Sequence, residues 1–202
     1  ADVTVVCDPA DYDAILDEIR AGGNTEKATR LKLSAKAYTH TAEYDAMIAA
    51  YMRAQAGLNE KLFLEFDLVQ SLRYGENPHQ QASLYLDPLN QNGFAHAEQL
   101  GGKPMSYNNY VDADAAWRAV WDFAPQIAVA VVKHNNPCGL AIGATVAEAH
   151  KKAHACDPMS AYGGVIAANS KVTMEMAESV RPIFTEVIVA PDYDADALEL
   201  LQ

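Results

Sequence analysis

The sequence predicts an α/β protein, a layered sheet with flanking helices, on three observations. Residues 127–132 are six consecutive apolar residues without polar alternation, which is typical of a strand covered on both faces, as in a parallel sheet between helices. From residue 127 onward, strand, helix, strand, helix and strand patterns follow one another. Half of the 202 residues are hydrophobic (50%), so the chain can bury a substantial core.

The amino-terminal part is expected to be mainly helical. Residues 3–6 have the composition of a short strand, and an apolar stripe with helical spacing begins at Tyr12. Gly22-Gly23 ends that helix, and a second, long helix runs from Asn24-Thr25 to about residue 55. Gly57 closes it and residues 62–69 become strand-like, so we place a domain boundary near residues 57–66.

Two polar loops interrupt the middle of the chain. The first covers residues 73–80 and is followed by a strand over 82–86 and by a turn at Asp87-Pro88 and residues 90–93. The second covers residues 101–109 and leads into a helix over about 111–123, with Asn109 as its expected cap.

The carboxyl-terminal part alternates helices and strands with caps and breakers between them. The expected elements are a helix over 145–155 opened by the capping box of Thr145 and Glu148, a strand over 165–168, a helix between Thr173 and Pro182, a strand over 187–190 and a helix over 195–201.

Charge and cysteine content exclude several classes. Fifteen Lys and Arg against 27 Asp and Glu give a net charge of −12, which disfavours binding to nucleic acid and to acidic membranes. No apolar run approaches the ~20 residues of a membrane span and no signal-peptide pattern is present, so we expect a cytoplasmic protein. The three cysteines, Cys7, Cys138 and Cys156, are typical of reduced thiols.

A structural metal is not predicted. Pro137-Cys138 is similar to the start of the Pro-Cys-x-x-Cys element of zinc deaminases, but position 141 is Ala and no His-x-Glu lies upstream.

Lys133-His134, at the end of the strand over residues 127–132, is the strongest candidate for chemistry. A single Lys at a strand end most often reaches into water. A Lys and a His presented together can exchange protons near neutral pH, because each cation lowers the pKa of the other. The amides that follow and Gly139 suit a backbone turned tightly around a ligand.

Other candidate groups can also be explained by a structural role without a ligand. Arg73-Tyr74 combines a planar anion binder with a phenol, although a surface Arg beside a half-buried Tyr would look the same. Asn108-Asn109 either caps the next helix or contacts a ligand. Gly163-Gly164 favours a turn over a phosphate cradle, because no phosphate-loop pattern surrounds it.

Four motifs together closely resemble the family of bifunctional purine biosynthesis proteins, which join AICAR formyltransferase to IMP cyclohydrolase. They are Leu-Arg-Tyr-Gly-Glu-Asn-Pro-His-Gln at 72–80, Ser-Tyr-Asn-Asn at 106–109, Lys-His-Asn-Asn-Pro-Cys-Gly at 133–139 and Asp-Pro-Met-Ser-Ala-Tyr-Gly-Gly at 157–164. Residues 3–12, with Lys-Ala-Tyr-Thr-His-Thr-Ala-Glu-Tyr-Asp at 36–45, resemble the tail of the cyclohydrolase domain.

The resemblance implies a domain order. In this family a cyclohydrolase domain folded like a methylglyoxal synthase precedes a transformylase domain of two cytidine-deaminase-like lobes. Residues 1–60 would be the carboxyl-terminal tail of the cyclohydrolase domain and a linker helix, and residues 61–202 the first part of the transformylase domain. The cyclohydrolase's own catalytic residues would then lie upstream of Ala1, and the second transformylase lobe beyond Gln202.

The resemblance also implies site residues. Lys133 and His134 match the family's catalytic pair, Arg73 and Tyr74 match positions that bind the AICAR nucleotide, and Asn108 and Asn109 match a stretch that contacts its carboxamide or ribose. The formyl donor would be 10-formyltetrahydrofolate, and the protein would be a homodimer. We assign no chemical role to Asn135, Asn136 and Cys138, where other members carry different residues. The alternative is a catalytically silent piece whose remaining activity is association, for example through the long helix.

Overall fold

The computed structural model describes residues 2–90 and 93–202, and it divides into two compact units, Ala1–Leu64 and Glu65–Gln202. The division falls within the stretch at 57–66 where the composition changes.

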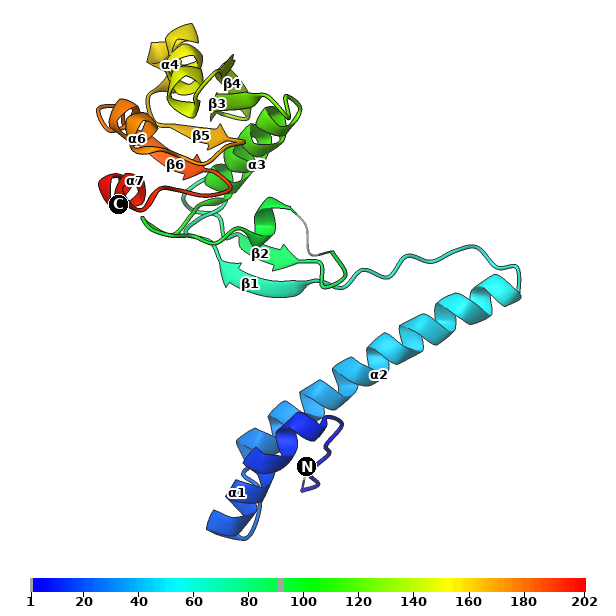
Figure 1. The fold of residues 1–202 in the computed structure, drawn as a ribbon. Helices are drawn as coiled ribbons and strands as arrows, with labels where there is room; N and C mark the ends of the chain where they lie inside the picture. The colour runs from blue at the N-terminus through cyan, green and yellow to red at the C-terminus, as the bar shows by residue number, and fades with distance from the viewer. Residues whose placement is uncertain (1, 91–92) are drawn as a thin grey trace. The chain divides into compact units, whose positions relative to one another are not determined.

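The first unit is helical, as predicted. It contains η1 (Pro9–Asp11), α1 (Tyr12–Gly22) and α2 (Lys27–Gln55), drawn from blue to cyan in Figure 1. Gly23 has a φ of 75° and closes α1, because glycine adopts the left-handed conformation without a steric cost. Ile15 and Leu33 are the buried apolar residues of its helices, so most of the 29-residue α2 is exposed. No helix among the described residues is long and apolar enough to cross a membrane.

The strand expected at residues 3–6 is wrong. These residues have no regular secondary structure, and Val3 and Val5 are 70% and 47% exposed. A strand needs a neighbour for its backbone hydrogen bonds, and the described part of this unit offers none. Strand-like composition alone therefore misled the prediction.

The second unit begins with an exposed antiparallel hairpin. Its strands are β1 (Asp67–Ser71) and β2 (Ser83–Leu86), so strand structure starts later than the composition of residues 62–69 indicated. The predicted turn after β2 is present where Asn90 N–H bonds the carbonyl of Asp87 at 3.1 Å. Residues 91–92 of that prediction lie outside the described residues, and η2 (Phe94–His96) follows them.

The main sheet has the strand order β4-β3-β5-β6. Its members are β3 (Ile127–Lys133), β4 (Asn136–Gly143), β5 (Gly164–Ala168) and β6 (Thr185–Val189). β3 pairs antiparallel with both neighbours, and only β5 and β6 are parallel. The α/β class is confirmed, but the parallel setting expected for β3 is wrong, because burial on both faces produces the same apolar run whichever way the neighbours point.

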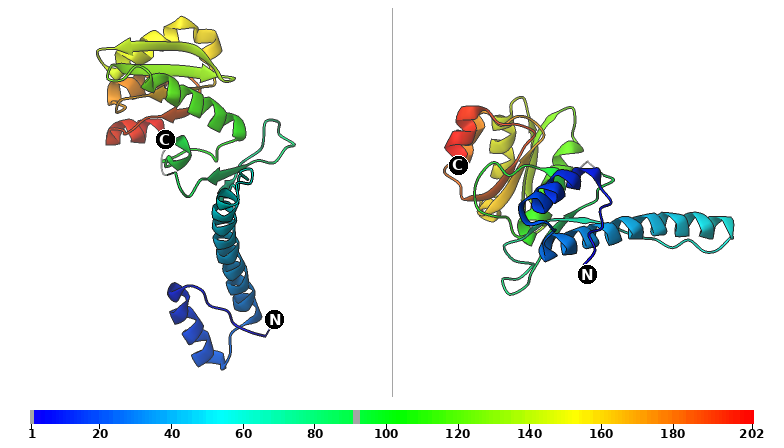
Figure 2. Two further views of the ribbon diagram at one scale, coloured as in Figure 1. Left: turned by 90° about the vertical axis from the view of Figure 1, so that its right-hand side faces the viewer. Right: turned by 90° about the horizontal axis from the view of Figure 1, so that it is seen from below.

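Helices cover both faces of this sheet (Figures 1 and 2). α3 (Tyr107–Trp121) packs on the face formed by Ala128, Ala130 and Val132. On the other face, Val129 and Val131 pack in a cluster with α4 (Val146–Cys156), α5 (Pro158–Ala161), α6 (Met174–Val180) and α7 (Ala195–Leu201). Alternate residues of β3 therefore supply both halves of the core, which explains the apolar run without alternation.

The helix starts follow side-chain caps. The hydroxyls of Thr145 and Thr173 accept the backbone N–H groups of Glu148 and Met176, which confirms both as caps. The Glu148 carboxylate accepts the N–H of Ala144 rather than that of Thr145, so the second bond of the predicted capping box is not formed as expected. α3, however, begins at Tyr107 rather than near residue 111, because Ser106 is its cap and Asn109 completes the capping box from inside the helix.

Candidate functional site

Lys133 and His134 lie where β3 turns into β4. Lys133 pairs with Asn136, which leaves a two-residue hairpin turn formed by His134 and Asn135. Both turn residues have positive φ, 53° and 61°, as a type I′ turn requires. A residue other than glycine in this conformation costs roughly 1–2 kcal/mol, although His and Asn tolerate it better than most. The expected tight backbone turn is present.

Gly139, which we expected at that turn, serves packing instead. It lies in β4, and a Cβ placed on it would be 2.0 Å from the carbonyl oxygen of Ala153 in α4. The glycine is required because the strand and the helix backbone are in contact there. Its prediction as part of a ligand-binding turn is therefore wrong.

The two side chains of the candidate pair have different surroundings. Lys133 is half-buried, and its Nζ donates a hydrogen bond to the carbonyl of Tyr162 at 2.6 Å. His134 is exposed, and its ring makes no hydrogen bond with a described residue. The imidazole is thus open to a ligand, while the ammonium is already held on one side.

Arg73 and Tyr74 form a local pair in the loop after β1. The Arg73 guanidinium lies over the Tyr74 ring, 5.0 Å from its centroid, and donates to the phenol oxygen at 3.3 Å. Arg73 is exposed and makes no ion pair with a described carboxylate. A guanidinium held in this way is prepared to bind an anion such as a phosphate.

This loop is bonded to the start of α3. Arg73 N–H donates to the carbonyl of Met105 at 3.1 Å, and Tyr107 N–H donates to the carbonyl of Tyr74 at 3.1 Å. The side-chain amide of Asn108 donates to the carbonyl of Glu76 at 3.0 Å. The structure therefore brings Arg73, Tyr74 and Asn108 together.

Asn109 is 7% exposed and its side chain is occupied by its own surroundings. Its Oδ1 accepts from Ser106 N at 3.0 Å and from Ser106 Oγ at 2.9 Å, and its Nδ2 donates to Glu186 Oε2 at 2.7 Å. Asn109 is therefore not the N-cap that we expected: Ser106 holds that position, and Asn109 is the N3 partner in its capping box. Glu186 of β6 was missed by sequence reasoning, and its only signal was an acidic residue next to the apolar run at 187–190.

Asp112 joins the hairpin to the same helix. Its Oδ1 accepts the backbone N–H of Asn135 at 2.6 Å. Asn108 and Asp112 are four residues apart in α3, so they share one face and are separated by about 6 Å along the axis. The hairpin and the Arg73 loop are therefore both attached to the first two turns of α3, whose amino-terminal end favours anions.

Cys138 is not equipped as a nucleophile. It lies half-buried in the bulge of β4, and burial, followed by the charge of Asp157, raises the pKa of its thiol. A raised pKa keeps the group as a thiol near neutral pH.

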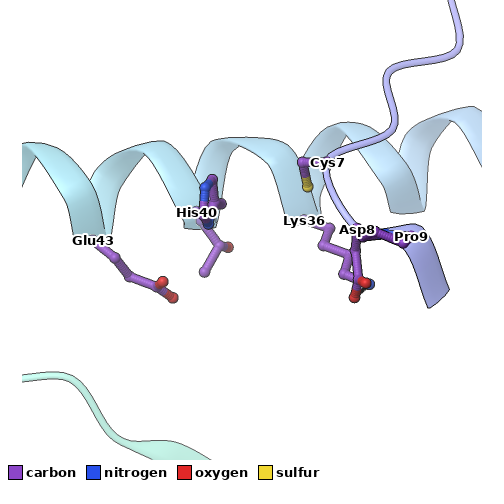
Figure 3. Close-up of a pocket in the computed structure, with 7 residues that line it drawn as sticks. Cys7, Asp8, Pro9, Lys36, His40 and Glu43 are labelled. Carbon is purple, nitrogen blue, oxygen red and sulfur yellow. Dashed lines mark hydrogen bonds and ion pairs between the residues drawn. The ribbon is translucent and has the colours of Figure 1, made fainter. Parts of the chain in front are cut away.

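Two depressions are lined by other residues. A groove of about 690 Å³ in the second unit runs along β6, between η2 and α7, and none of the predicted site residues lines it. A depression of about 500 Å³ in the first unit is lined by residues 7–9 and by one side of α2 from Lys36 to Glu43 (Figure 3).

In this second depression Lys36 contacts two carboxylates. Its Nζ lies 2.8 Å from Asp11 and 2.5 Å from Asp8, and these bonds raise the pKa of Lys36 above its ordinary value. The segments at 3–12 and 36–45 therefore meet in space. No group of three or more His, Cys, Asp or Glu within the described ranges could hold a metal ion.

These features define a mixed α/β protein with a Lys-His pair at a hairpin and an exposed Arg in a loop that is bonded to the same helix. The family model of the AICARFT/IMPCHase bienzyme matches residues 1–202, and the chain belongs to this family. It is 54% identical over 210 aligned positions to the bifunctional purine biosynthesis protein PurH of Mycobacterium ulcerans (strain Agy99). The match covers 98% of this chain and 39% of that relative's length.

Proposed function

We propose that this chain is part of a purine biosynthesis enzyme that transfers a formyl group from 10-formyltetrahydrofolate to the 5-amino group of AICAR, giving FAICAR. The protein would also cyclise FAICAR to IMP. The observation that carries the proposal is the attachment of the Lys133-His134 hairpin and the Arg73 loop to the same two turns of α3. Membership of the bienzyme family supports it across the whole chain.

The domains follow from the same proposal. Residues 1–60 are the carboxyl-terminal tail of the methylglyoxal-synthase-like cyclohydrolase domain with a linker helix, and residues 61–202 are the first part of the transformylase domain, a deaminase-like lobe. The sheet order with helices on both faces supports the second assignment. The meeting of residues 3–12 and 36–45 supports the first.

The chemistry needs two proton movements. The 5-amino nitrogen attacks the formyl carbon, loses a proton and forms a tetrahedral oxyanion, which collapses as the folate nitrogen leaves and takes up a proton. His134, with its open imidazole, helps to remove the proton from the amine. Lys133 stabilises the oxyanion or protonates the departing nitrogen.

Substrate binding is assigned to the loop and the start of α3. Arg73 and Tyr74 bind the nucleotide, for which a guanidinium without an ion pair to any described carboxylate is suited. Asn108 and Asn109 contact its carboxamide or ribose. Because the Asn109 amide already bonds Ser106 and Glu186, its contact with AICAR uses the remaining amide hydrogen or replaces the Glu186 bond. The protein acts as a cytoplasmic homodimer, with no metal, nucleic acid or membrane involved.

Steady-state kinetics of the full-length protein test this assignment. Lys133→Ala and His134→Ala should each lower AICAR-dependent release of tetrahydrofolate by on the order of 10²–10⁴-fold, the usual contribution of a positioned acid or base. Arg73→Ala should mainly raise KM for AICAR. Near-normal turnover in Lys133→Ala or in His134→Ala would contradict the assignment of these residues as the catalytic pair.

The alternative is a silent piece that retains only association. The many exposed apolar residues of α2, among them Leu31, Tyr38 and Met47, favour a surface that is covered by other protein. Two measurements distinguish the active enzyme from the silent piece: the intact mass compared with the full reading frame, and a turnover assay of the 202-residue chain. Turnover by this chain alone would exclude the catalytically silent alternative.

A further inference from the structure

The turn that carries His134 departs from the usual sequence of its class. Two-residue turns with positive φ at both positions favour Asn-Gly, whereas this chain places His134 and Asn135 there. Neither residue has the conformational freedom of glycine. The turn therefore needs support from outside the hairpin to hold one conformation.

That support converges on a single peptide group, the one between His134 and Asn135. Its N–H, from Asn135, donates to Asp112 Oδ1 at 2.6 Å, and its C=O, from His134, accepts from Asn136 Nδ2 at 2.9 Å. Both ends of the peptide are thus held, which fixes ψ of His134 and φ of Asn135. The bond from Asp112 is the stronger of the two, because its acceptor is charged.

Asp112 is well placed to act as an anchor. Its neighbour Ala113 and the next residue on that face, Ala116, are fully buried against β3, so the helix backbone at this point is held by the core. Asp112 is half-buried and makes no ion pair with any cation in the described ranges. Its hydrogen bond to the turn is therefore its main described interaction.

We propose that Asp112 is a positioning residue for His134. By clamping the His134–Asn135 peptide it sets the direction in which the imidazole meets its substrate. The inference rests on the proposed formyl transfer, since it requires His134 to take part in the reaction. It adds a residue that no sequence motif pointed to.

The test uses the full-length protein with Asp112→Ala and Asp112→Asn. A displacement of about 1 Å in a reacting group can cost on the order of 10²-fold in rate, so Asp112→Ala should lower kcat by roughly 10- to 100-fold. KM for AICAR should stay within about twofold, because the nucleotide is held by other residues. Asp112→Asn keeps an oxygen acceptor and should keep kcat within about threefold.

A matched control lies two residues further along α3. Asp114 pairs with Arg118 at 2.9 Å and not with the hairpin, so Asp114→Ala should leave kcat unchanged. Asn135→Gly provides the rescue: in the Asp112→Ala background, glycine adopts positive φ freely and should recover most of the lost kcat. A general loss of stability, which thermal unfolding measures, would not produce this pattern of loss and rescue.

The outcomes separate the two proposals. If Lys133→Ala and His134→Ala are inactive but Asp112→Ala turns over normally, the positioning role is wrong and the proposed function stands. The positioning role is also wrong if Asp112→Asn loses as much kcat as Asp112→Ala and Asn135→Gly restores none of it, or if the loss appears in KM. Near-normal turnover of His134→Ala removes both proposals.

Discussion

His150 should make the stability of this protein depend on pH. It lies in α4 and is 1% exposed, among the buried residues of that helix. Ser179 Oγ donates its proton to the carbonyl of Met176 at 2.7 Å, so it accepts from His150 Nδ1 at 2.8 Å. The ring nitrogen Nε2 has no partner among the described residues. This is a neutral imidazole in an apolar site.

Burial lowers the pKa of His150 from 6.5 to about 4, helped by the nearby charges of His154 and Lys151. The unfolded chain therefore binds a proton between pH 6.5 and pH 4 that the folded chain does not. Stability must fall as pH falls through this window. Integrating this difference from pH 7 to pH 5 gives a loss of about 2 kcal/mol from this residue alone.

Urea unfolding at pH 7 and pH 5 measures this contribution. The loss between the two pH values should be about 2 kcal/mol smaller in His150→Gln, which cannot titrate, than in the unsubstituted protein. His154→Gln removes the smaller contribution of the neighbouring charge and leaves the burial of His150 intact, so it should change this loss much less than His150→Gln does. Equal pH sensitivity in the unsubstituted protein and His150→Gln would refute the reasoning.

Two further substitutions test the contacts that β4 and β3 make with the rest of the second unit. Gly139→Ala places a Cβ 2.0 Å from the carbonyl oxygen of Ala153, so we expect urea unfolding to show a free energy of unfolding lower by about 3 kcal/mol or more. Gly22→Ala is the control and should cost nothing, because its Cβ would have no described neighbour within 4 Å. Asn169→Ala removes hydrogen bonds of 2.8–2.9 Å to the backbone of Ala128, Val120 and Gln126. It should lower the free energy of unfolding by about 3 kcal/mol, and a loss below about 1 kcal/mol would show that water replaces these bonds.

Most helices and strands of this fold could be predicted from the sequence, because local signals define them. Gly23, Thr145 and Thr173 act within a few residues of their own position, and each performs the expected role. β4 could not be predicted, because Asn136 and Pro137 are turn-type residues and become a strand only by pairing with β3. The direction of pairing is likewise a property of the assembled sheet.

The candidate site divides in the same way. Its motifs could be found in the sequence, since Arg73-Tyr74 and Lys133-His134 are adjacent pairs. The residues that connect them could not be found, because Asp112 bonds a residue 23 positions away and Asn109 bonds Glu186 across 77 positions. An isolated Asp on a helix gives no sequence signal, and an isolated Glu before an apolar run is too common a pattern to single out Glu186.

The two loops around Arg73 and Tyr107 are joined by main-chain hydrogen bonds, from Arg73 N–H to Met105 and from Tyr107 N–H to Tyr74. Such bonds do not depend on which side chains the residues carry. Evolution can therefore change the side chains at these positions while the loops keep their spacing. The same scaffold could present a different set of side chains by substitution alone, without any insertion or rearrangement of the chain.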